Sequence, residues 1–138
     1  MTKFLLTVDY QNGAIETPMT EWAPEVIKAH MDYYAVLLRE LAESGELVED
    51  NALTGPELAK VVTWDGVTAP VVTDGPFAEF KEMLAGYELV DVESEARAIE
   101  IAAKLSCVPG PDGVPLQQPI GVRRVMQAGD FELLMSET

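Results

Sequence analysis

Cysteine and histidine are scarce in this sequence: each occurs once, as Cys107 and His30, among 138 residues. One cysteine excludes a disulfide within the chain, and a domain of this length buries about two-thirds of its unfolded surface without one. A reducing cytoplasm is therefore the expected location. The sequence also lacks HExxH, a Cys/His cluster, a Walker loop and GxGxxG, so we expect no metal ion and no nucleotide or dinucleotide cofactor.

Basic residues are few as well, with 9 Lys and Arg against 24 Asp and Glu, a net charge of −15. Such a surface repels phosphate backbones and anionic membranes, so neither nucleic acid nor a membrane is an expected partner. The acidity is interpreted first as a source of solubility, and otherwise as a face for a basic protein. No apolar run reaches the roughly eighteen residues of a membrane span, and the start MTKFLLTVDYQNG lacks the features of a signal peptide.

The rest of the composition is that of an ordinary globular protein, with 48% hydrophobic and 24% charged residues. Internal repeats, low-complexity tracts and a domain linker are absent. The sequence predicts one domain over residues 1–138, with a Pro/Gly-rich loop at 108–119 and an acidic tail at 128–138.

Hydrophobic periodicity predicts an order of strand, helix, several strands, helix and strand. This order favours an α+β fold with both helices packed on one face of an antiparallel sheet. In the first helix, Ile27, Met31, Tyr34, Leu38 and Leu41 recur every three or four residues, so this stripe is expected to be buried. Strands are expected at 3–9, 46–53, 60–73 (a hairpin split at Asp65-Gly66), 83–92 and 120–127, and helices at about 20–44 and 93–106.

The stretch VTDGPFAEFKEMLAGYELVDV, which begins at Val72, places a rigid turn and several charges between two apolar strands. It resembles the signature of the DGPF-type proteins, a branch of the YCII-related family. Three further segments are similar to the first strand, to the first helix with the second strand, and to the second helix of these proteins, so that the resemblance covers most of residues 3–127. These segments are KFLLTVDY, AHMDYYAVLLRELAESGELV and SEARAIEIAAKLS.

The resemblance implies a ferredoxin-like α+β fold whose sheets join in a homodimer to form a dimeric α+β barrel. It also implies small pockets bounded by sheet and helices. Muconolactone isomerases and chloromuconolactone dehalogenases use such pockets, and some DGPF-type proteins are encoded beside extracytoplasmic-function sigma factors. The sequence departs from the family pattern at EDNAL (49–53), at Ala85 where a second glycine is usual, and in the length of the 108–119 loop.

His30 and Asp74 are the candidate catalytic residues. Imidazole titrates near neutrality and suits proton transfer, and the family resemblance matches AHM to a helix histidine proposed to pair with an aspartate. Asp74, held by the Gly75-Pro76 turn, is the preferred orienting carboxylate, with Asp112 as the other possibility. The structural alternatives are a semi-buried His30 that bonds a backbone carbonyl and an Asp74 that caps its own turn.

Lys81, Glu79, Tyr87 and Tyr34 are the candidate substrate-binding residues. Lys81 beside a cavity would hold a small anionic ligand such as a carboxylate or enolate. Otherwise Lys81 and Glu79 form a solvated ion pair, and the two tyrosines belong to the core.

Two functions follow as hypotheses. The first is a homodimeric small-molecule-binding protein with acid–base chemistry of the isomerase, lyase or dehalogenase type. The alternative is a non-catalytic interaction module, accessory to a sigma factor. An old enzyme scaffold that has lost its activity is a third interpretation.

Overall fold

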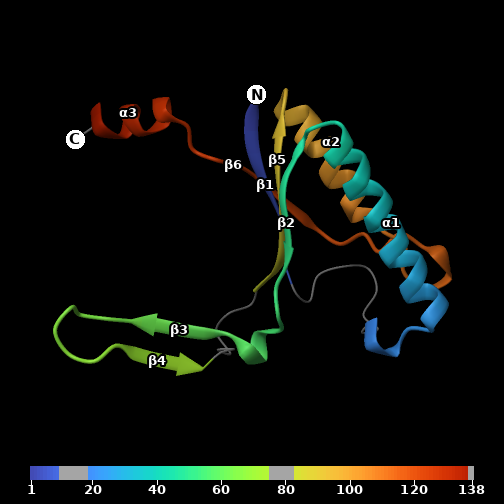
Figure 1. Ribbon diagram of the computed structural model, residues 1–138, viewed down its shortest axis with the longest axis horizontal. Helices are drawn as coiled ribbons and strands as arrows, with labels where there is room; N and C mark the ends of the chain where they lie inside the picture. Colours follow the sequence, from blue (N-terminus) through green and yellow to red (C-terminus); the bar gives the residue numbers. More distant parts are fainter. Residues whose placement is uncertain (10–18, 75–82, 137–138) are drawn as a thin grey trace.

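Two layers make up the body of the computed structural model, which describes residues 1–9, 19–74 and 83–136. Two helices cover one face of a four-stranded antiparallel sheet and leave the other face open (Figure 1). The predicted α+β class and the packing of both helices on one face are confirmed. These elements are β1 (Thr2–Asp9), α1 (Pro24–Glu43), β2 (Leu47–Ala52), β5 (Leu84–Val92), α2 (Glu95–Ser106) and β6 (Ile120–Arg124).

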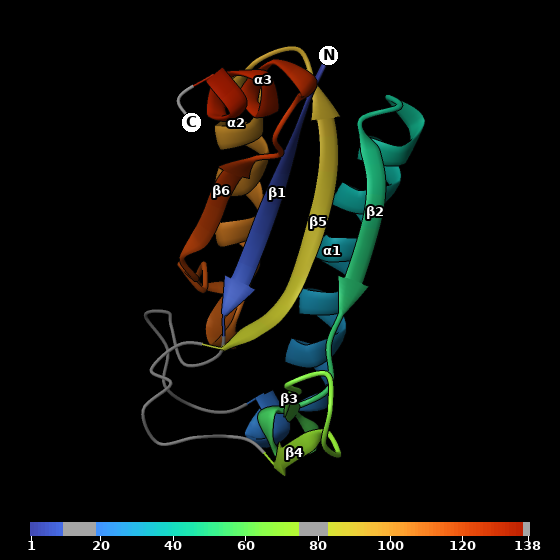
Figure 2. The same cartoon turned by 90° about the vertical axis from the view of Figure 1, so that its left-hand side faces the viewer.

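The strand order in the sheet is β2-β5-β1-β6, with every neighbouring pair antiparallel. Figure 2 looks onto the open face, with α1 and α2 behind it. The chain order β1-α1-β2 followed by β5-α2-β6 is the βαββαβ arrangement of the ferredoxin-like fold. The first and third strands of that arrangement, β1 and β5, are therefore the central pair.

Alternation along the central strands decides which side chains enter the core. In β5, Glu88, Val90 and Val92 point toward the helices, and in β1 Phe4 and Leu6 do the same. The intervening Leu5 and Leu89 pair with each other on the open face and are half-buried there. The core between sheet and helices is formed by Phe4, Leu6, Leu37, Leu41, Val90, Val92, Ala98, Ile101, Ala102 and Leu105.

Both helices have recognisable terminal residues. Pro24 occupies the first turn of α1, and Gly45 follows its end with a φ of 81°. Ser94 caps α2, because its side chain accepts a hydrogen bond from the Arg97 amide at 3.2 Å.

The buried face of α1 agrees with the predicted one in part, at Leu41 but not at Met31. His30, Leu37 and Leu41 are buried, whereas Met31 is 57% exposed. Met31, Tyr34 and Leu38 from the expected stripe line a cavity, and of these Tyr34 also packs against the core.

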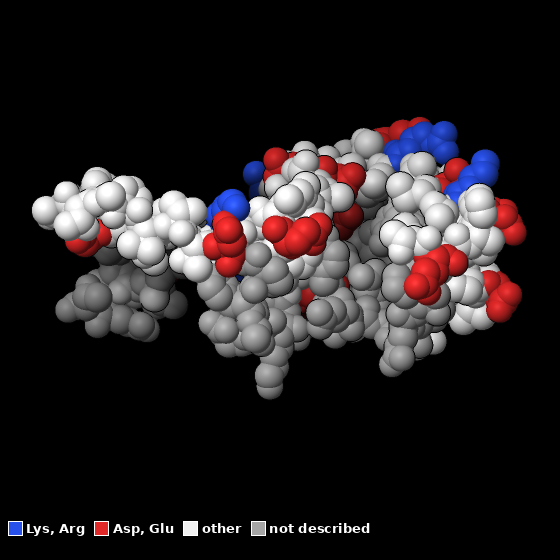
Figure 3. Space-filling view, turned by 90° about the horizontal axis from the view of Figure 1, so that it is seen from below, with Lys and Arg blue, Asp and Glu red and all other residues white. Residues whose placement is uncertain are grey.

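The predicted hairpin is confirmed, but it forms a sheet of its own, β3 (Lys60–Thr63) with β4 (Val71–Asp74). It extends from the body as an arm, and its surface is largely uncharged in Figure 3. Its apolar side chains include Val62, Trp64 and Val72, all exposed. Asp65 organises the turn, since its carboxylate accepts hydrogen bonds from the amides of residues 67 and 68.

The C-terminal region corrects one expectation. The segment predicted as an acidic tail contains a third helix, α3 (Ala128–Ser136), joined to β6 by an Arg124–Asp130 ion pair. The side chains of Phe131, Leu133 and Leu134 are exposed. Like the hairpin, α3 projects on the side of the sheet that the helices leave open (Figure 1).

The loop after α2 is confirmed as mostly irregular, with one short 3-10 turn (Pro111–Gly113). Pro109 and Pro115 form an isolated antiparallel bridge across it. Within the described ranges, no helix combines the length and the apolar character needed to cross a membrane.

Candidate functional site

A cavity of about 370 Å³ lies between α1 and the sheet, where β1 ends and β5 begins. Most of its wall is apolar, but two carboxylic acids from neighbouring strands also belong to it. Concave, mostly apolar hollows with a few polar groups are the usual form of small-molecule sites. The cavity is lined by Val8, Met19, Met31, Tyr34, Leu38, Asp50, Asn51, Ala52, Ala85, Gly86 and Glu88.

Glu88 is the most unusual side chain of this wall. It is only 7% exposed, and its Oε2 atom is buried without a hydrogen-bond donor among the described residues. It lies in the middle of β5, opposite Leu6 on β1 and Asp50 on β2. Burial, with the nearby charge of Asp50 and a hydrogen bond to it, raises the pKa of Glu88 to about 8.

Asp50 is the second carboxyl group and comes from β2, the edge strand. It is exposed, whereas its partner Glu88 is buried. Opposite residues on paired strands have Cβ atoms about 5 Å apart, so the strand register holds the two carboxyl groups together. The pair therefore combines a buried carboxyl group with an exposed one.

Tyr34 and His30 both belong to α1, and the His30 ring contacts Tyr34. Tyr34 lines the cavity, and burial together with the charge of Glu88 raises its pKa to about 12, so its hydroxyl stays protonated. The His30 ring packs edge-on against Tyr34 and Trp22, with centroid distances of 5.1 and 5.4 Å. Its Nδ1 atom lies 3.1 Å from the Pro109 carbonyl oxygen, to which it donates, and burial lowers its pKa.

His30 is 4% exposed and is not among the side chains that line the cavity. The structure does not bring it together with Asp74, whose carboxylate forms an exposed ion pair with Lys60 on the hairpin. The backbone carbonyl of Pro109 takes the place expected for an orienting carboxylate. Asp112 is in the same loop as Pro109 but has a left-handed φ of 60°.

The predicted substrate-binding residues are divided. Tyr34 lines the cavity, but Tyr87 belongs to the open face, where its hydroxyl donates to Glu49 (3.2 Å) and accepts from Asn51 (3.0 Å). Lys81 and Glu79 lie outside the described residues. So does most of the DGPF segment, which precedes β5 in the sequence.

Sequence reasoning missed Glu88 and Asp50, although one signal for Glu88 was present. In the strand YELVDV, Glu88 alternates in phase with Val90 and Val92, which places it on the buried face. A glutamate in phase with buried valines indicates a carboxyl group with an abnormal environment. Nothing in the sequence identifies Asp50 as its partner.

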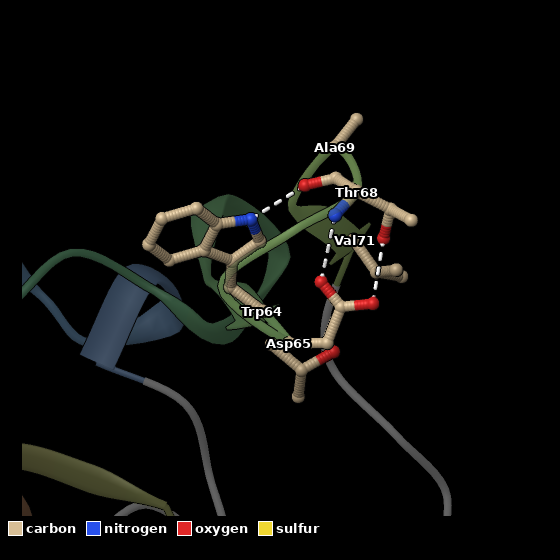
Figure 4. Close-up of a pocket in the computed structure, with 6 residues that line it drawn as sticks. Trp64, Asp65, Thr68, Ala69 and Val71 are labelled. Atoms are coloured by element: carbon tan, nitrogen blue, oxygen red, sulfur yellow. Dashed lines mark hydrogen bonds between the residues drawn. The ribbon is translucent and has the colours of Figure 1, made fainter.

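Two other hollows are less suited to a ligand. At the hairpin tip (Figure 4), Trp64 donates its indole N–H to the Thr68 carbonyl, and the Asp65 carboxylate is occupied by residue 68. A groove of about 490 Å³ lies beside α1 at Tyr33, whose hydroxyl donates to the Lys104 carbonyl. Within the described ranges, no group of three or more His, Cys, Asp or Glu side chains is placed to hold a metal ion.

Comparison with known proteins identifies a family for this chain. Residues 2–110 match the YCII-related domain, a range that includes His30, Asp50 and Glu88. The chain belongs to the YCII-related family. It is also similar to the uncharacterized protein R00369 of Rhizobium meliloti (strain 1021), with 32% identity over 91 residues. That alignment covers 66% of this chain and 73% of the relative. Assignment to the DGPF branch stays a prediction.

Proposed function

We propose that this YCII-related protein binds a small molecule in the cavity between α1 and the sheet and transfers a proton to or from it. One observation carries the proposal: a nearly buried carboxyl group, Glu88, lines an apolar cavity beside a second carboxyl group, Asp50. Paired carboxyl groups in unequal environments titrate at different pH values, and such pairs divide the roles of acid and base.

The pair has the properties that proton transfer requires. A general acid or base is most effective when its pKa is near the working pH, and the pKa of Glu88 is raised to about 8. Near neutral pH, Glu88 is then mostly protonated and can act as the acid, with the exposed Asp50 carboxyl group beside it. A positioned side chain of this kind typically contributes about 10²–10⁴-fold to a rate.

The remaining residues support this role. Tyr34 offers a protonated hydroxyl from α1, and His30 fixes the Tyr34 ring from behind. We therefore assign His30 as a positioning residue. The reaction class that fits is proton transfer of the isomerase, lyase or dehalogenase type. The predicted role of Lys81 as the holder of an anionic substrate concerns a residue outside the described ranges.

Proton transfer can be tested by exchange into solvent. The protein is incubated in D₂O with a library of small ketones, acids and amines, and NMR follows ligand binding and deuterium incorporation. We expect exchange in at least one bound ligand, with Glu88→Gln reducing the rate by about 10²-fold or more and leaving binding measurable. Glu57→Gln, at an exposed site away from the cavity, is the control. Ligands that bind without any exchange would refute proton transfer and support the alternative of a non-catalytic module.

We also propose that two copies pair through the open face of the sheet. Leu5 and Leu89 pair across β1 and β5 at the centre of this face and are half-buried already. The hairpin and α3 project on the same side and offer exposed apolar side chains to a second copy. Sedimentation equilibrium of the wild type and of Leu89→Lys tests this. A monomeric wild type at micromolar concentration would contradict it.

A further inference from the structure

We infer that the cavity is selective for a small organic cation: a substituted ammonium whose short apolar body lies against α1 and whose charged group is held by Glu88 and Asp50. This inference rests on the proposed function, because it names the ligand class for the same cavity. It reverses the charge that the sequence predicts for the ligand. The ionisable side chains of the described lining are Asp50, Glu88 and Tyr34, and all three are acids. The described lining contains no Lys, Arg or His.

The walls separate into two parts that match the two parts of such a ligand. Asp50 and Glu88, from β2 and β5, form an acidic side. The opposite side is formed by α1, with Met31, Leu38 and the aromatic ring of Tyr34. Aromatic rings attract ammonium groups through their electron-rich faces, and apolar side chains accommodate the attached carbon chain.

The buried Glu88 oxygen gives an independent reason to expect a hydrogen-bond donor. Oε2 has no donor within the described part of the chain, and the side chain is more than nine-tenths buried. An ammonium group carries several N–H donors and a positive charge, so it satisfies the carboxylate and compensates its burial. A carboxylate ligand would instead place a third acidic group beside the pair.

Binding is coupled to the loss of a proton from Glu88. In the free protein, burial and the charge of Asp50 keep Glu88 protonated near neutral pH. When the ammonium enters, the Glu88 carboxyl releases its proton to the buffer, and the resulting carboxylate pairs with the cation. The groups that face Glu88 are Asp50 from β2 and Tyr34 from α1; β1 contributes the uncharged Leu6 and Val8.

Isothermal titration calorimetry tests the inference with matched probes: propyl-, butyl- and cyclohexylammonium, the corresponding alcohols, and butyrate. Titrations at pH 7 in two buffers of different ionisation enthalpy measure the protons released per ligand. We expect the ammonium ions to bind at least tenfold more tightly than the alcohols and butyrate, with close to one proton released. Their affinity should rise with pH up to about pH 8, by at most tenfold per unit.

Variants separate the two carboxyl groups. Glu88→Gln should weaken ammonium binding at least tenfold and abolish proton release, whereas Asp50→Asn should weaken binding but retain release. Glu49→Gln, on the same strand as Asp50 but on the opposite face, should behave as wild type. Circular dichroism verifies that each variant is folded, and the exposed Asp50 supplies a test if Glu88→Gln does not fold.

Equal affinity for butyrate and butylammonium, or ammonium binding without proton release, would overturn the inference. Its failure is distinguishable from failure of the proposed function. Deuterium exchange into neutral ketones without ammonium binding contradicts only the ligand class. Ammonium binding with proton release, but without exchange into any ligand, contradicts only the proton-transfer function.

Discussion

Replacing Glu88 with Gln should change how the stability of the protein depends on pH. The pKa of Glu88 is raised from 4.5 to about 8 by burial and by Asp50, so the folded chain retains a proton that the unfolded chain loses above pH 4.5. Stability from this group is therefore fully present below pH 4.5, decreases as the pH rises, and is lost above about pH 8. Glutamine is neutral at every pH and keeps an N–H donor for Asp50.

One pKa unit corresponds to about 1.4 kcal/mol, so a pKa that moves from 4.5 to about 8 costs the wild type at most about 3.5 kcal/mol between pH 5 and pH 8. Urea unfolding at pH 5, 6, 7 and 8, followed by circular dichroism, measures the free energy of unfolding. The difference between Glu88→Gln and wild type should grow in favour of the variant by about that amount. The exposed Glu57→Gln should follow the wild type. Parallel curves for wild type and Glu88→Gln would refute the burial argument.

Three other predictions concern stability. Glu46→Gln should destabilise the protein by roughly 1–2 kcal/mol at pH 7, because the Glu46 carboxylate accepts two hydrogen bonds from Arg97 at 2.9 Å. This difference should shrink as the pH falls from 4.5 toward 2, because the pKa of Glu46 is lowered to about 2; urea unfolding at pH 7 and pH 2.5 should show a much smaller difference at the lower pH. Leu6→Ala should cost about 2–5 kcal/mol in thermal unfolding, whereas the exposed Leu133→Ala should stay within about 0.5 kcal/mol of wild type. Asp65→Ala should accelerate amide hydrogen exchange in the hairpin and leave exchange in the main sheet unchanged, because the hairpin forms a separate sheet.

The elements that sequence predicts well are those whose signals are local. Alternating side chains locate β1 and β5, Asp65-Gly66 locates the hairpin turn, and helical periodicity locates α2. These features depend on residues a few positions apart, so that one segment of sequence contains all the information. The family resemblance adds the ferredoxin-like topology, which depends on the whole chain.

The candidate site depends on contacts between distant segments. Glu88 and Asp50 become neighbours only through the register of β2 on β5, which periodicity does not specify. The burial of α1 was misjudged for the same reason: Met31 meets a cavity, and a cavity between layers has no signature in the helix itself. The helix α3 was missed because its apolar side chains are exposed and form no single buried face.

The position of Glu88 in the sheet has a consequence for how the cavity can diversify. β5 is hydrogen-bonded on both sides, by β1 and by β2, so the backbone beneath Glu88 has little freedom to move. The facing side chains of Met31 and Leu38, by contrast, belong to one helix and are not part of the buried core cluster. Substitution at these two positions should change the shape of ligand that the cavity binds, while the Glu88 carboxyl group keeps its position.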